Sequence, residues 1–136
     1  MDLTDIQRYR IALERLRRIL DIKLGKPLLI RTFMGHLRVL HASDIGYFRY
    51  ISAKKSWEIA LTDGSFLRLK GNLRAENLCA YDEKSIQIHQ SYIINLHYLY
   101  MIQKNHCIMC TPFHHVTELQ VSQKHKKEIL ERFGQF

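Results

Sequence analysis

The spacing of the apolar residues changes near Pro27, and this change constrains the fold more than any other feature of the sequence. From Thr4 to Leu24, apolar residues recur in alternating steps of three and four, which is the period of one face of an α-helix. Beyond Pro27 they fall in short runs separated by turn residues, which is typical of β-strands. The sequence therefore predicts an N-terminal amphipathic helix within residues 1–26 and a mainly β domain over residues 27–136.

The predicted helix has clear signals at both ends. Thr4 and Gln7 form a capping-box pattern at its start, and Gly25 with Pro27 ends it. Its apolar stripe consists of five residues: Ile6, Tyr9, Leu13, Leu16 and Leu20. Three more widen the stripe beyond a narrow coiled-coil seam: Ile11, Ile19 and Ile22. Such a helix either docks on its own domain or pairs with a second copy, and we expect a homodimer through this helix.

Most of the remaining chain has the texture of strands. Five runs in its first part have this character: residues 28–33, 37–40, 45–51, 57–61 and 66–69. Asp63 and Gly64 lie between the last two runs, and Asp-Gly is a strong signal for a β-hairpin. Asn72 is expected to cap a short helix over residues 73–79.

The last third continues the β pattern and then changes to a helix. Residues 86–119 predict three or four strands, broken near Leu96-His97, Asn105-His106 and Pro112. A terminal helix is expected to follow Ser122.

The charge balance points to a polyanionic partner. Lys and Arg number 21 and Asp and Glu number 13, which gives a net charge of +8 and a pI near 9.6. Outside the first helix the basic residues form three clusters: Lys54-Lys55, Arg68-Lys70-Arg74 and Lys124-His125-Lys126-Lys127. The third cluster opens the terminal helix, where the helix dipole disfavours cations by about 0.3–1 kcal/mol each. This order indicates that an anion such as a DNA phosphate binds there, although a solvated surface with screened charges is the alternative.

Several classes of protein fit the sequence poorly. The three cysteines are an odd number without a signal segment, so we expect a reducing, cytoplasmic environment. Residues 85–103 carry no formal charge, but their frequent polar side chains oppose a membrane span. Cys107 and Cys110 suggest a metal or redox pair, yet residues three apart on a strand point to opposite faces. We therefore expect no metal, no cofactor and no membrane contact.

Catalytic signals are equally scarce. The sequence has no Gly-rich phosphate loop, no His-Glu-x-x-His and no suitably spaced pair of carboxylates. We expect neither an enzyme nor a small-molecule substrate.

Three motifs, in this order along the chain, resemble the LytTR DNA-binding domain, the output module of many bacterial response regulators. The first is the hairpin at residues 62–64 leading to Gly71-Asn72-Leu73. The second is His89-Gln90-Ser91-Tyr92-Ile93-Ile94-Asn95, and the third is Leu119-Gln120-Val121-Ser122 before the basic helix. The resemblance covers roughly residues 28–133 and implies an elongated arrangement of small antiparallel β-sheets with short helices.

The resemblance also implies a function. Family domains bind double-stranded promoter DNA as pairs on repeated sites, inserting loops into successive major grooves and bending the duplex. The resemblance carries the DNA contacts over to six positions of this sequence: Lys54, Lys55, Ser56, Gln90, Gln123 and Lys124. Two further residues complete the predicted DNA contacts: His89, and Lys127 from the third basic cluster. For His89, a phosphate contact and a buried structural role are both open.

This sequence departs from the family pattern at two of these places. Members often have Arg or Asn where this chain has Gln90, and Arg pairs where it has Gln123 and Lys124. Gln can still bond adenine and Lys can still donate to guanine, so base reading stays possible with weaker phosphate affinity. The alternative is a degenerate LytTR-like module that binds proteins through its first helix instead of specific DNA.

Overall fold

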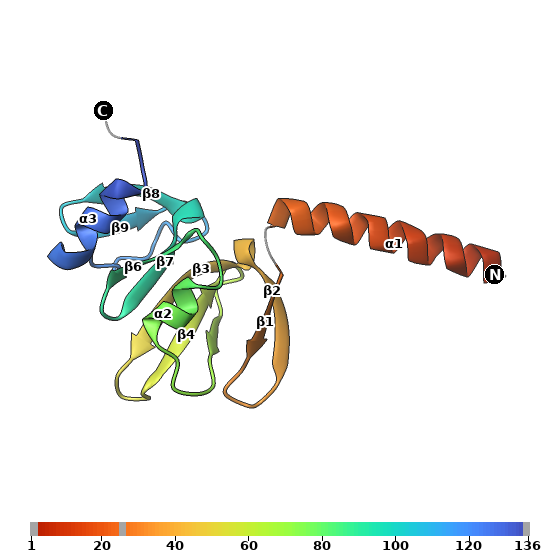
Figure 1. Cartoon of the computed structure of the whole chain (residues 1–136), viewed down its shortest axis with the longest axis horizontal. Helices are drawn as coiled ribbons and strands as arrows, with labels where there is room; N and C mark the ends of the chain where they lie inside the picture. Colours follow the sequence, from red (N-terminus) through yellow and green to blue (C-terminus); the bar gives the residue numbers. More distant parts are fainter. Residues whose placement is uncertain (1–2, 25–26, 135–136) are drawn as a thin grey trace.

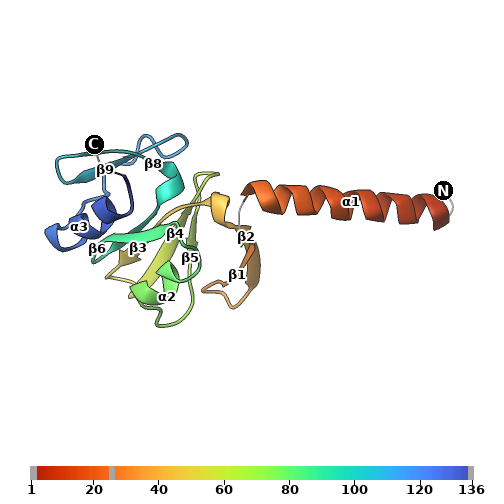
Figure 2. The same ribbon diagram turned by 45° about the horizontal axis from the view of Figure 1, so that its top comes forward.

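The computed structural model of the chain describes residues 3–24 and 27–134. The helix α1 (Leu3–Leu24) confirms the predicted N-terminal helix almost residue for residue. Figures 1 and 2 show it extending away from the body of the protein. From Thr4 to Ile19 its side chains are exposed, apart from a half-buried Asp5. The body therefore does not cover the apolar stripe in this part of the helix.

The body is built around a five-stranded antiparallel sheet with the strand order β5-β4-β3-β7-β6. These strands are β3 (Ile45–Ile51), β4 (Ser56–Leu61), β5 (Phe66–Arg68), β6 (Ser85–His89) and β7 (Tyr92–Asn95). Two antiparallel hairpins accompany it: β1 (Pro27–Arg31) with β2 (Leu37–His41), and β8 (Leu99–Gln103) with β9 (His106–Met109). The small helices are η1 (Ala42–Asp44), α2 (Ala75–Cys79), η2 (Leu96–Tyr98) and α3 (Gln123–Glu131).

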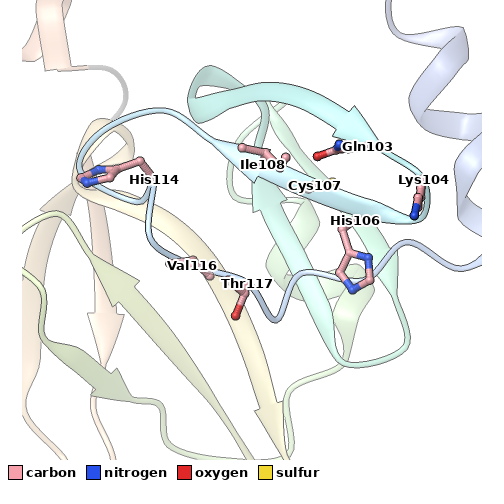
Figure 3. A pocket seen from close by; sticks show the side chains of 8 residues that line it. All are labelled: Gln103, Lys104, His106, Cys107, Ile108, His114, Val116 and Thr117. Carbon is pink, nitrogen blue, oxygen red and sulfur yellow. The ribbon is translucent and has the colours of Figure 1, made fainter.

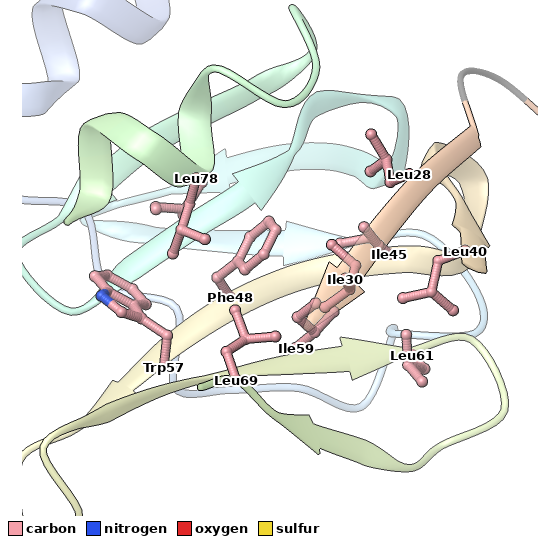
Figure 4. Packing of buried hydrophobic residues seen from close by; sticks show 11 residues of the cluster. Leu28, Ile30, Leu40, Ile45, Phe48, Trp57, Ile59, Leu61, Leu69 and Leu78 are labelled. Atoms are coloured by element: carbon pink, nitrogen blue, oxygen red, sulfur yellow. The ribbon is translucent and has the colours of Figure 1, made fainter. Parts of the chain in front are cut away.

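Both faces of the central sheet are buried, because consecutive residues of its strands point into two different cores. Phe48 and Ile59 point to the face covered by the β1–β2 hairpin and α2, as Figure 4 shows. Tyr47 and Ala60 point to the opposite face, which β9, α3 and the segment between them cover. All six residues of β4 are buried. This sheet holds its turns in fixed positions because it is packed on both sides.

The structure corrects the prediction for the short helix. Its N-cap is Arg74, not Asn72, and α2 begins at Ala75. The Leu73 carbonyl accepts a hydrogen bond from Trp57 Nε1 at 3.1 Å, and the Arg74 N–H donates to Asn77 Oδ1 at 3.0 Å. Tertiary bonding thus keeps Asn72 outside the helix, so this part of the prediction is wrong.

The uncharged stretch at residues 85–103 forms β6, β7, η2 and β8. In the part of the chain that the structure describes, no helix has the length and apolar character needed to cross a membrane.

Candidate nucleic-acid interface

Two turns that are far apart in the sequence lie together at one end of the central sheet. The β3–β4 turn covers residues 52–55 and the β6–β7 turn covers residues 90–91. Because β3 and β7 are antiparallel neighbours, the end of one lies beside the start of the other. The Tyr50 N–H donates to the Ser91 carbonyl at 2.8 Å, which ties the two turns together. Figure 1 shows them on the same side of the body.

The terminal helix begins at the same end of the sheet. The Ser122 N–H, at the N-cap of α3, donates to the Ile88 carbonyl near the end of β6 at 2.8 Å. This bond places the first turn of α3 beside the β6–β7 turn. We call the combined region the sheet-end surface; it consists of residues 52–55, residues 90–91 and residues 123–127.

The structure brings most of the predicted DNA contacts together on the sheet-end surface. Six of them are exposed there: Lys54, Lys55, Gln90, Gln123, Lys124 and Lys127. On α3, Gln123 and Lys127 are four residues apart and Lys124 precedes Lys127 by three, so the three side chains share one face. The surface thus combines cations with amides that are able to read base edges.

The remaining two predicted residues lie at its edge and are engaged within the protein. Ser56 is buried, and its hydroxyl accepts a hydrogen bond from Arg68 Nε at 2.9 Å. His89 is half-buried, and its Nδ1 accepts from the Ser91 N–H at 3.0 Å. These bonds favour a supporting role, in which Ser56 holds the β3–β4 turn and His89 shapes the β6–β7 turn.

Arg68 is a residue that the sequence reasoning placed in a basic cluster but not in the site. Its Nη2 donates to the Lys54 carbonyl at 3.3 Å, and its guanidinium carbon lies 3.6 Å from the centre of the Phe33 ring. Arg68 therefore clamps the β3–β4 turn against the tip of the β1–β2 hairpin. Only the register of β4 with β5, which pairs Glu58 with Arg68, reveals this position.

A buried carboxylate lies below the same turn. Glu58 Oε1 is 3.2 Å from Lys54 Nζ, and Glu58 Oε2 is 3.1 Å from Arg49 Nη2. Arg49 Nη1 also reaches Glu118 Oε1 at 3.3 Å, four residues before the N-cap of α3. Burial alone would raise the pKa of Glu58, but the hydrogen bonds from Arg49 and Lys54 outweigh it and hold that pKa below 4.5. This ion-pair network connects the β3–β4 turn with the segment that leads into α3.

One histidine in the basic cluster differs from its neighbours. His125 is half-buried, and its Nδ1 lies 2.5 Å from Ser122 Oγ. Burial lowers the pKa of His125, and the nearby charge of Lys124 lowers it further. The positive charge on the first turn of α3 is therefore carried by lysines.

A separate cavity of about 490 Å³ lies at the β8–β9 hairpin (Figure 3). Its wall includes Lys104, His106 and His114 together with apolar side chains such as Ile108. None of the predicted DNA contacts lines it. Across the described residues, no three His, Cys, Asp or Glu side chains are grouped closely enough to hold a metal ion. Burial raises the pKa of the Cys107 thiol to about 11, so this sulfur stays protonated.

Comparisons with known proteins identify the family and agree with the fold. The family model of the LytTr DNA-binding domain matches residues 35–134. A solved structure, described as the LytTr DNA-binding domain of a methyl-accepting/DNA response regulator from Bacillus cereus, superposes with a TM-score of 0.58. It is 17% identical, and the match covers 82% of this chain and 100% of that chain, so it supports the fold. No curated protein matches the sequence. The family match spans most of the body, and the chain belongs to the LytTR DNA-binding domain family.

Proposed function

We propose that this protein is a bacterial, cytoplasmic transcriptional regulator that binds double-stranded promoter DNA with sequence specificity. Its β3–β4 turn, its β6–β7 turn and the first turn of α3 enter successive major grooves of a repeated site. Lys54, Lys55, Lys124 and Lys127 contact phosphates or guanine, and Gln90 reads a base edge. Gln123 likewise contacts a base edge through its side-chain amide.

The observation that carries this proposal is the convergence of the three elements on one sheet-end surface. Backbone hydrogen bonds of 2.8 Å link each element to the next, so their spacing is fixed before DNA arrives. The first turn of α3 carries no acidic residue, which leaves the positive end of the helix dipole free for a phosphate. A preformed surface of this kind binds DNA without the cost of ordering its loops.

The test is selection of bound duplexes from a random pool, followed by mobility-shift titrations of the selected duplex and a scrambled one. We expect a selected sequence with a repeated element, and an affinity that falls steeply with salt for both duplexes. Each phosphate that a lysine neutralises contributes about −0.9 to the slope of log affinity against log salt, because counterions are released. No shift at low salt, or a slope near zero, would contradict the proposal.

The second candidate is a protein-interaction module, and the uncovered stripe of α1 favours it. Such a module would select no duplex but would still associate through α1. We propose that the partner of α1 is a second copy of this chain, which would hold two DNA-binding domains together on a repeated site. The two candidates therefore share α1 and differ in whether the sheet-end surface recognises a sequence.

A further inference from the structure

The apolar stripe of the N-terminal helix is exposed at its first four positions. Ile6 is 45% exposed, Tyr9 61%, Leu13 65% and Leu16 52%. A shallow groove of about 380 Å³ runs beside this stripe, and its walls include Tyr9, Leu13 and Arg17. A groove next to protruding apolar side chains is the surface that knobs-into-holes packing requires from each of two identical helices.

The stripe follows a heptad pattern, written abcdefg, in which a and d are the core positions. Three a positions are Ile6, Leu13 and Leu20, and the d positions are Tyr9, Leu16 and, at the end of the helix, Lys23. The flanking e positions are then Arg10 and Arg17, and the flanking g positions carry no cation: Asp5, Ala12 and Ile19. The charges are thus divided unequally between the two sides of the stripe.

This division distinguishes the two directions in which a second copy can pair. In an antiparallel pair the e positions of the two helices face each other, so Arg10 and Arg17 would lie against arginines of the other copy. In a parallel pair each e position faces a g position, so Arg10 lies near Asp5 and Arg17 near Ala12 of the other copy. We propose that two copies of this chain associate through their α1 helices in parallel, with the apolar stripe as the interface.

A parallel pair has a consequence for the rest of the molecule. The body joins α1 at its C-terminal end, so both bodies lie at the same end of the paired helices. Packed helix axes are about 8–10 Å apart, and the three residue steps from Leu24 to Pro27 span at most about 11 Å. The two DNA-binding domains are therefore held as near neighbours, which raises the effective concentration of the second domain on a repeated site. This consequence rests on the proposed function, whereas the pairing itself does not.

The pairing is tested with two cysteine variants of the full chain. Ile6→Cys places a thiol at an a position. Ile11→Cys is the matched control, because Ile11 lies at an f position on the outer side of the helix and does not widen the stripe, contrary to the prediction from the sequence. In a parallel pair the two copies of residue 6 lie opposite each other, within the Cα separation of about 7 Å that a disulfide allows. In an antiparallel pair they are at least about 15 Å apart along the axis. We expect Ile6→Cys to form a disulfide-linked dimer under mild oxidation, and Ile11→Cys to resemble the parent chain with its native cysteines.

Sedimentation of the double variant Leu13→Lys, Leu16→Lys adds a second measurement. We expect a monomer with an unchanged β-type circular dichroism spectrum, and at least a tenfold loss of affinity for a paired DNA site but not for one half-site. A monomeric parent chain, or equal cross-linking of both cysteine variants, would overturn the pairing. A dimer without an Ile6→Cys disulfide would overturn the parallel direction. Cross-linking without selection of any DNA sequence would leave the pairing intact and refute the proposed function.

Discussion

The helix α1 and the β body use similar apolar residues in opposite ways. In the body, residues such as Ile93 and Ile94 have no exposed surface, because the central sheet is covered on both faces. On α1, Ile11 is 49% exposed and Leu13 is 65% exposed. The comparison teaches that composition alone does not show whether apolar residues form a core. In the body these residues stabilise its own fold, whereas on α1 they are left exposed, and the proposed pairing would cover those of the stripe.

The same contrast holds for charge. The body buries Glu58 and surrounds it with Arg49 and Lys54, whereas Glu14 on α1 is exposed. The family match begins at residue 35 and so leaves α1 out. The DNA binding proposed for the body depends on a fixed set of turns, whereas the pairing proposed for α1 depends on an exposed surface.

The largest difference between the two regions should come from the same truncation, Ile→Ala, made once in the body and once on α1. Ile93→Ala removes a fully buried side chain between the sheet and α2, and we expect it to lower the free energy of unfolding by about 2–5 kcal/mol. Ile11→Ala removes an identical group from exposed α1, and we expect a change within about 0.5 kcal/mol. Urea titration followed by tryptophan fluorescence measures both. Comparable losses in the two variants would show that α1 belongs to the core of the body.

This contrast also explains how far the sequence could predict the structure. Period-3.6 and period-2 patterns gave α1, residues 45–51 of β3 and the start of α3 correctly, because each pattern is local. The prediction that Asn72 caps the short helix was wrong, because the hydrogen bond from Trp57 to the Leu73 carbonyl is a tertiary contact that no local pattern reveals. The two-sided core was not predicted, since it depends on which hairpin covers which face.

For the candidate site, the resemblance supplied the residues but not their surroundings. Residue type gave no indication that Ser56 is buried against Arg68 while Lys55 beside it is exposed. The only sequence signal for the ion-pair network is one acidic residue, Glu58, within a run that is otherwise uncharged from Ser56 to Leu61. Arg49 lies opposite Glu58 in the register of β3 with β4, and the Glu118 that Arg49 also reaches comes from a distant segment outside the strands. The register and the tertiary fold were therefore needed to find the network.

The next effect concerns the two carboxylates. Glu58→Gln removes the charge that pairs with Arg49 and Lys54, and we expect a loss of about 1–3 kcal/mol in the free energy of unfolding at neutral pH. Because the pKa of Glu58 is lowered in the folded state, its carboxylate stabilises the fold above pH 4.5. This contribution is lost as the pH falls below 4.5 and the carboxylate becomes protonated. The difference between parent and variant should therefore shrink on acidification.

Glu14→Gln on α1 is the matched control for this measurement. Its carboxylate is exposed, so we expect the free energy of unfolding to change by no more than about 0.5 kcal/mol at any pH. A Glu58→Gln variant with parental stability at neutral pH, or a difference that grows on acidification, would show that the network does not stabilise the body.

The remaining effects concern DNA recognition at single base pairs or single phosphates, and they separate two kinds of residue on the sheet-end surface. Gln90→Ala should reduce discrimination at one base pair by about 1–3 kcal/mol and leave other positions unchanged, since a bidentate amide reads one base. Lys124→Ala should weaken binding to selected and random duplexes by similar factors and reduce the magnitude of the salt slope by about 0.9.

Gln7→Ala on α1 and Lys84→Ala, before β6 at the opposite end of that strand, are the matched controls. They should change neither the base discrimination nor the salt slope on a single half-site. Mobility-shift titrations against every single-base variant of the half-site give the discrimination, and repetition at several salt concentrations gives the slope. Because Gln90 projects from a turn held to β3 by the Tyr50–Ser91 hydrogen bond, its loss should leave the fold intact. An unaltered base preference in Gln90→Ala, with circular dichroism like that of the parent, would remove the β6–β7 turn from the base-reading surface and leave it a phosphate-binding role.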